Sequence, residues 1–143
     1  MAYFEQLMRE HDKLAALAQE LLARVNATAL DIAGLIDLRT LLAGLLANHL
    51  VIEDGAIYPK LTNNADYQVA QIARRFIDEF ADIATVWGSY LDHWTAARIA
   101  EDLTGFQNAT RTVVRRLTDR IRMENEQLYP LALRVGAIEL RRA

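Results

Sequence analysis

A histidine and a glutamate stand four positions apart in an apolar stretch of the sequence. Only Leu50, Val51 and Ile52 separate His49 from Glu53. Residues four apart on an α-helix differ in direction by about 40°, so these two side chains would share one face. An imidazole and a carboxylate inside an apolar helix bundle need a polar partner, and a metal ion is one such partner. The pair therefore suggests a metal site, while the same spacing is also common at helix surfaces.

The segment that contains this pair is weakly repeated near the end of the chain. The first copy is HLVIEDGAIYP, residues 49–59, and the second is RIRMENEQLYP, residues 120–130, 71 positions later. Glutamate, tyrosine and proline coincide, and both of the chain's prolines belong to the repeat. The main chemical difference is Arg120 in place of histidine. A weaker match pairs Glu10-His11 with Glu79-Phe80, so each half would contribute one polar cluster.

Composition excludes several classes of function. The 143 residues are the size of one domain, and we expect residues 1–143 to form a single one. The chain has no cysteine, which excludes disulfides, thiol catalysis and cysteine-bound metals. Its one serine, Ser89, lies in no Gly-x-Ser-x-Gly turn, and its six glycines form no phosphate-binding loop. No catalytic residue is predicted, and an enzyme is not the expected class.

Charge and hydropathy also limit the partners. A net charge of −3 does not indicate nucleic-acid binding, and we expect the arginines of residues 111–122 other than Arg120 to lie on a solvated helix face. No window of 18 residues is both apolar and uncharged, so no membrane contact is expected. The first residues lack the basic and apolar regions of a signal peptide, and the expected location is cytoplasmic. A homodimer or an unidentified protein partner is left open.

The apolar residues follow helical spacing throughout, in four sets. Asp31 is a candidate cap for the second helix, which we expect Pro59 and residues 62–66 to end. A third long helix would run from the break at residues 62–66 to a connection that begins at Trp94, and Thr95 would cap a short extra helix before the fourth. The prediction is an all-α, up-down-up-down four-helix bundle with an internal two-fold repeat. Trp87, Tyr90 and Trp94 would form core or a dimer contact, and Tyr58 and Tyr129 would pack at the bundle end.

These motifs resemble one known family. Glu-His11-Asp, His49-x-x-x-Glu53-Asp54 before Ile-Tyr-Pro, and Glu124 before Leu-Tyr-Pro are similar to the hemerythrin-like, or HHE cation-binding, domain over nearly the whole chain. The resemblance implies a four-helix bundle that holds two irons, with one histidine and one H-x-x-x-E-type motif from each half. It implies that His11 and His49 ligate one iron and that Glu53 and Glu124 bridge the pair.

The sequence departs from that pattern at two positions. Phe80 and Arg120 stand where the second half would supply its histidines, and neither side chain ligates iron. Both losses fall on one iron, which implies a degenerate site for a single divalent metal, with iron expected. Family members bind dioxygen, sense oxygen or iron, or help to repair iron centres. Their reversible dioxygen binding uses two irons, which counts against that activity here.

Two interpretations of the site remain open at this point. His11, His49, Glu53 and Glu124 suit one Fe(II), Mn(II) or Zn(II) with room for water. Arg120 would then fill the vacated metal position and neutralise the two glutamates. The same ion pairs would also hold with no metal, in a bundle that serves as an interaction or regulatory module.

Overall fold

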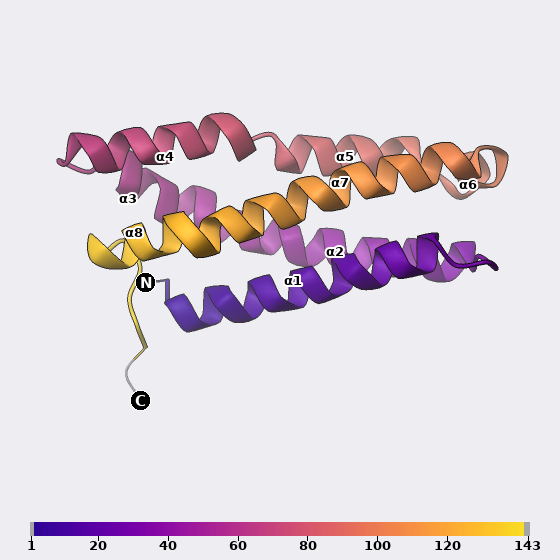
Figure 1. The fold of residues 1–143 in the computed structure, drawn as a ribbon, viewed down its shortest axis with the longest axis horizontal. Helices are drawn as coiled ribbons and strands as arrows, with labels where there is room; N and C mark the ends of the chain where they lie inside the picture. Colours follow the sequence, from indigo (N-terminus) through magenta and orange to yellow (C-terminus); the bar gives the residue numbers. More distant parts are fainter. Residues whose placement is uncertain (1, 142–143) are drawn as a thin grey trace.

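The computed structural model describes residues 2–141, and every regular element within that range is helical. The elements are α1 (Phe4–Val25), α2 (Ile32–Ile52), η1 (Glu53–Ile57), α3 (Tyr58–Thr62), α4 (Tyr67–Phe80), α5 (Ile83–His93), α6 (Ala96–Glu101), α7 (Leu103–Met123), η2 (Glu124–Leu128) and α8 (Tyr129–Arg134), where η denotes a π-helical turn. Figure 1 shows α1, α2, the α4–α5 pair and α7 running lengthwise, with both termini at the same end of the molecule. The predicted all-α bundle is confirmed.

Short polar side chains begin several of these helices. Asp31 Oδ1 accepts a hydrogen bond from the Gly34 amide at 3.1 Å, and Thr95 Oγ1 accepts one from the Arg98 amide at 3.3 Å. Each bond satisfies a backbone donor that the first helical turn leaves without an intrahelical acceptor. The predicted cap of α2 and the predicted short helix after Thr95 are therefore both confirmed.

The prediction that Pro59 helps to end the second helix was wrong, because a π-turn carries the chain past it. In η1 the Tyr58 amide donates to the Glu53 carbonyl five residues back, and in η2 the Tyr129 amide donates to the Glu124 carbonyl. A proline inside an α-helix clashes with the carbonyl four residues earlier, and the wider π-turn relieves that clash. The helical run therefore ends at Thr62, and both repeats contain the same local distortion.

The expected single third helix is broken between α4 and α5. The break leaves carbonyl groups at the end of α4 without intrahelical donors. Two arginines from α7 supply them: Arg116 Nη2 donates to the Glu79 carbonyl at 3.3 Å, and Arg120 Nη1 donates to the Phe80 carbonyl at 3.1 Å. Contacts with a distant helix thus stabilise the interruption, and the apolar spacing of one helix cannot predict such contacts.

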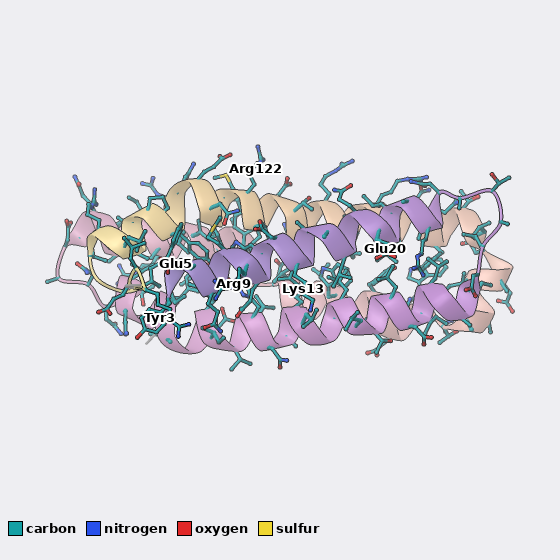
Figure 2. All side chains as sticks on the ribbon, turned by 90° about the horizontal axis from the view of Figure 1, so that it is seen from below. Tyr3, Glu5, Arg9, Lys13, Glu20 and Arg122 are labelled. Atoms are coloured by element: carbon teal, nitrogen blue, oxygen red, sulfur yellow. The ribbon has the colours of Figure 1, made fainter. Side chains whose placement is uncertain are left out.

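The core consists of two apolar clusters with a polar layer between them. Along α1 the layer falls between Leu7, which belongs to one cluster, and Leu14, which belongs to the other. Trp87 and Tyr90 of α5 and Trp94 directly after it are 2%, 5% and 9% exposed, so this aromatic stripe belongs to the core, one of the two places predicted for it. Charged side chains lie around the outside of the helices, among them Arg9, Lys13 and Glu20, which are labelled in Figure 2.

The second helical run, Ile32–Thr62, is apolar on more than its inner face. Leu41 and Val51 are 51% and 73% exposed. By length and composition this run could cross a membrane, a result that the sequence did not lead us to expect. The core helices of soluble proteins meet the same criterion, and this helix carries His49 and Glu53 into the polar layer of the bundle.

Candidate metal centre

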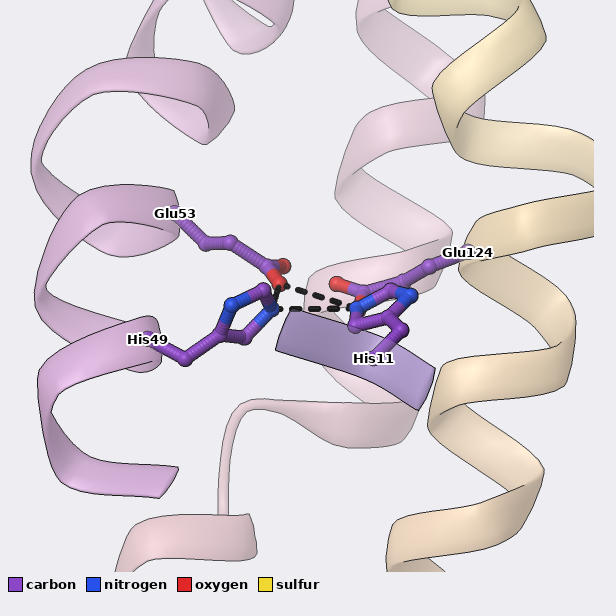
Figure 3. Close-up of side chains that lie close together, drawn as sticks. All are labelled: His11, His49, Glu53 and Glu124. Atoms are coloured by element: carbon purple, nitrogen blue, oxygen red, sulfur yellow. Dashed lines mark hydrogen bonds and ion pairs between the residues drawn. The ribbon is translucent and has the colours of Figure 1, made fainter. Parts of the chain in front are cut away.

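Four buried side chains from different parts of the chain meet in the polar layer. His11 comes from α1, His49 from α2, Glu53 from the start of η1 and Glu124 from the start of η2. Their exposed fractions are 0%, 3%, 0% and 1%. One nitrogen or oxygen atom from each lies within 4.8 Å of the others, and Figure 3 shows these atoms pointing toward one another. The structure thus brings together the four residues that the sequence proposed as metal ligands.

Two of the three distances measured from His11 Nε2 match the ligand spacing expected around a single metal ion. His11 Nε2 lies 3.0 Å from His49 Nε2, 3.0 Å from Glu124 Oε1 and 3.6 Å from Glu53 Oε1. Ligands at bond lengths of about 2.1 Å on one tetrahedral or octahedral ion would be about 3.0–3.4 Å apart. Two imidazole nitrogens and two carboxylate oxygens are also a donor set that Fe(II), Mn(II) and Zn(II) accept. The residues present therefore fit a divalent transition metal.

Each histidine is oriented through its other ring nitrogen. His11 Nδ1 lies 2.6 Å from Asn125 Oδ1, and His49 Nδ1 lies 2.7 Å from Glu10 Oε1. An acceptor at Nδ1 holds the proton there and leaves the Nε2 lone pair free for a metal. Glu10 and Asn125 each directly adjoin a predicted ligand in the sequence, but neither was predicted to act at the site. The structure adds both as orienting residues.

Each glutamate divides its two oxygens between opposite sides. The Oε1 atoms face the histidines, and the Oε2 atoms face Arg120. Arg120 Nε lies 3.3 Å from Glu124 Oε2 and Arg120 Nη2 lies 3.4 Å from Glu53 Oε2, with the arginine only 3% exposed. The guanidinium therefore lies opposite the histidine pair, against both carboxylates.

Two tyrosines cross-link the repeated halves at the same carboxylates. Tyr58 donates its hydroxyl hydrogen bond to Glu124 Oε2 at 2.7 Å, and Tyr129 donates to Glu53 Oε1 at 3.1 Å. The Tyr129 hydroxyl also lies 2.9 Å from His11 Nε2. Both rings belong to the apolar cluster that contains Leu7, and their hydroxyls also reach the polar layer, a contact that was not predicted. Each tyrosine serves the glutamate of the other half.

Burial and close pairing shift the pKa values of the whole cluster. Burial alone would lower the pKa of His11, but hydrogen bonds with Glu124 and Glu53 raise it to about 9. Burial and the neighbouring Glu53 charge raise the pKa of Glu124 to about 7, whereas Glu53, despite its burial, has its pKa held well below the usual range by bonds to Glu124 and both histidines. Without metal, a proton on His11 therefore supplies positive charge between the carboxylates.

Comparison with known families agrees with this geometry. The model of the hemerythrin HHE cation binding domain matches residues 3–132. The chain belongs to this family. No curated protein and no solved structure gives a match. Membership in a cation-binding family and a buried histidine–glutamate cluster that could hold a metal both point to metal binding by this hemerythrin-like protein.

The second half of the hemerythrin-like centre lacks histidines at the positions that matched His11 and His49. Phe80 is 3% exposed and packs against Phe76 with ring centroids 4.9 Å apart, while its carbonyl accepts the bond from Arg120. A cavity of about 300 Å³ lies beside these residues and is lined by Arg120, Tyr58 and Phe80 among others. The third histidine of the chain, His93, is exposed at the end of α5, where it accepts from Arg98 Nη1 at 2.7 Å and takes no part in the cluster.

Proposed function

We propose that this hemerythrin-like protein binds one divalent metal ion, with iron expected, and that Arg120 serves as the second cation of the centre. The main support for this proposal is the orientation of the Glu53 and Glu124 carboxylates. Their two Oε1 atoms face the histidines, and their two Oε2 atoms face the guanidinium. His11 Nε2, His49 Nε2, Glu53 Oε1 and Glu124 Oε1 would hold the metal. A guanidinium presents planar N–H donors that match carboxylate oxygens, so it can occupy the position of a bridged cation.

Charge supports one ion rather than two. A second divalent ion would lie against the permanently charged Arg120 and would find no histidine there. One divalent ion and Arg120 bring three positive charges against the two bridging carboxylates. Two outer carboxylates offset the excess: Glu10 lies 2.7 Å from His49 Nδ1, and Asp54 Oδ1 lies 3.7 Å from Arg120 Nη2.

The role that follows is sensing or handling of iron or oxygen. A bound divalent metal would supply a Lewis-acidic, redox-capable ion with coordination positions left for a small ligand. The chain would fix the imidazoles through Glu10 and Asn125 and keep the centre dry by burial. The Tyr129 hydroxyl, 2.9 Å from His11 Nε2, would place one hydrogen-bonding group next to the ion. The cavity beside Arg120 would give small molecules a route toward the polar layer.

A second candidate function is a metal-free interaction or regulatory module. It is favoured because the chain's own side chains already provide partners for the buried glutamates. Arg120 pairs with both glutamates, and the hydroxyls of Tyr58 and Tyr129 donate to the same carboxylates. A His11 with its pKa raised to about 9 would stay protonated near neutral pH and supply a further positive charge. Such a core would need no metal to be stable.

Metal content separates the two candidates. Protein stripped by chelation and reloaded anaerobically with Fe(II), Mn(II) or Zn(II) should retain about one ion per chain after gel filtration. His49→Ala should retain far less, whereas His93→Ala, which removes the histidine outside the cluster, should retain as much as the unchanged protein. Failure to retain any of the three metals would leave the metal-free module, and two tightly held ions would contradict the single-metal proposal.

A further inference from the structure

A second buried arginine lies far along the bundle from the metal centre. Arg39 of α2 is 5% exposed and lies within the apolar cluster that includes Trp87, Tyr90 and Trp94. Among the residues that the structure describes, no carboxylate forms an ion pair with it. This differs from Arg120, which pairs with two buried glutamates. Buried charges are ordinarily paired, so an unpaired guanidinium calls for another counter-charge.

Within residues 2–141, the groups that hydrogen-bond or stack with Arg39 are neutral. Its Nη1 donates to the Trp94 carbonyl at 2.8 Å, and its guanidinium lies 5.2 Å from the centre of the Tyr90 ring. Thr110 Oγ1 donates to the Phe106 carbonyl at 2.8 Å, so the Tyr90 hydroxyl, 2.7 Å away, must be the donor to Thr110. Burial raises the pKa of Tyr90 although Thr110 and Arg39 act to lower it, and the phenol stays uncharged at neutral pH. No neighbour therefore neutralises Arg39.

Two hydrogen-bond donors in this cluster also lack acceptors. Arg39 Nε and Trp87 Nε1 are buried side-chain nitrogens with no partner within the described chain. Both belong to groups arranged around one ring: the Trp87 and Tyr90 rings are 5.6 Å apart, and Arg39 lies over Tyr90. Both unpartnered atoms are donors, so what is missing is an acceptor.

We infer that Arg39 and Trp87 form a binding site for a small inorganic anion of halide size. A water molecule would accept these bonds but would leave the guanidinium charge uncompensated. A halide accepts N–H bonds and supplies the missing negative charge at the same time. Close packing favours a small ion, since Arg39, Trp87 and Tyr90 are all at most 5% exposed. The bound anion would join α2 to α5 at the end of the bundle away from the metal ligands.

The two tryptophans of the chain provide a direct probe. Trp87 would bond the anion, and Trp94 supplies the carbonyl that holds Arg39, while the chain has no other tryptophan. Iodide quenches tryptophan fluorescence on contact. Titration of metal-free protein with iodide at constant ionic strength, with gluconate as the balancing anion, should give quenching that saturates. Added chloride should compete and restore the emission.

Variants make the test specific. Arg39→Met keeps an unbranched side chain and removes the charge, so it should show only weak quenching that rises linearly with iodide. Arg115→Met, which removes an exposed arginine, should behave like the unchanged protein. Chloride should also raise the melting temperature of the unchanged protein and leave that of Arg39→Met unaffected.

A further variant decides the question even if Arg39→Met does not fold. Trp87→Phe removes one of the two unpartnered donors and retains the charge, with Trp94 left as the probe. Its halide dissociation constant should be higher by about tenfold or more. Linear quenching in the unchanged protein, or equal halide affinity in the unchanged protein and Trp87→Phe, would overturn the assignment.

Discussion

The two halves of the centre hold their glutamates alike but differ in what stands opposite them. In the first half, His11 and His49 face the carboxylates and are oriented by Asn125 and Glu10. In the second half, Arg120 alone faces both carboxylates from within the bundle. One guanidinium thus lies where the family resemblance implied a metal ion and its histidines. Under the proposed function, the buried carboxylate pair would have a cation on each side, a metal ion beside the histidines and the Arg120 guanidinium opposite them.

The framework around the centre is the same in both halves. Each glutamate begins a π-turn, and each tyrosine five residues later bonds the opposite glutamate. Across the repeat, the orienting acceptors Asn125 and Glu10 match Asp54 and Glu79, both of which carry carboxylates. The backbone therefore positions the carboxylates whether or not histidines stand opposite them, which makes the second half a candidate for repair.

Restoring both histidines should change the centre most. Phe80→His combined with Arg120→His should raise the metal capacity from about one to about two ions per chain, because each new imidazole would replace a residue that cannot ligate metal. Either change alone should do less. The double variant should be weaker without metal and recover when loaded, since binding to the folded state stabilises it.

Elemental analysis of the stripped and reloaded double variant gives the answer. A variant that folds and still holds only one ion would show that Phe80 or Arg120 does not occupy a ligand position. The register drawn between the two halves would then be wrong.

Removing the guanidinium should have the largest effect on stability. Arg120→Met leaves Glu53 and Glu124 buried without their cation, and we expect the metal-free protein to lose about 3–5 kcal/mol of unfolding free energy. Divalent metal should recover part of the loss. The matched control is Arg122→Met, which removes an exposed arginine from the same helix and should cost no more than about 0.5 kcal/mol. Equal denaturant midpoints for the two variants would refute the ion-pair model.

Removing the carboxylate next to each histidine position, Glu10 or Glu79, should affect metal affinity differently in the two halves. Glu10→Ala removes the acceptor at His49 Nδ1 and should weaken metal binding about 10- to 100-fold. Glu79→Ala changes the matching residue of the second half, which faces no histidine, and should leave metal affinity unchanged. Competition with a fluorescent chelator would measure both constants. Similar losses in the two variants would mean that neither half is specialised for metal.

The pH dependence should differ between metal-free and loaded protein. The pKa of His11, raised from 6.5 to about 9, lies above its unfolded value, so its contribution to stability is full below pH 6.5 and lost as the pH rises through 9. Glu124, with its pKa raised to about 7, acts in the same direction at lower pH. Metal binding must displace the His11 proton, so the stabilisation that metal adds should grow over the same window. Melting curves at pH 6.5, 8 and 9.5 would test this, and metal-free stability that rises with pH would contradict it.

Helical spacing of the apolar residues was enough to predict the bundle, and the repeat singled out the two glutamates and Arg120, which contacts both. Helical spacing failed where the chain departs from regular helix. A π-turn adds one residue within a short stretch, which apolar spacing does not reveal, so Pro59 was misjudged. The break after Phe80 depends on arginines from a distant helix. Glu10 and Asn125 act through the second nitrogen of each histidine, and that contact exists only once the helices are packed.

The central claim is that one metal and one guanidinium share the two carboxylates. Crystals of the Fe(II)-loaded protein, with anomalous diffraction measured on both sides of the iron absorption edge, test it most directly. We expect one anomalous peak per chain, bounded by His11 Nε2, His49 Nε2 and the two Oε1 atoms, with Arg120 still on the Oε2 atoms. Two peaks, or a single peak at the position of a displaced Arg120 side chain, would contradict it.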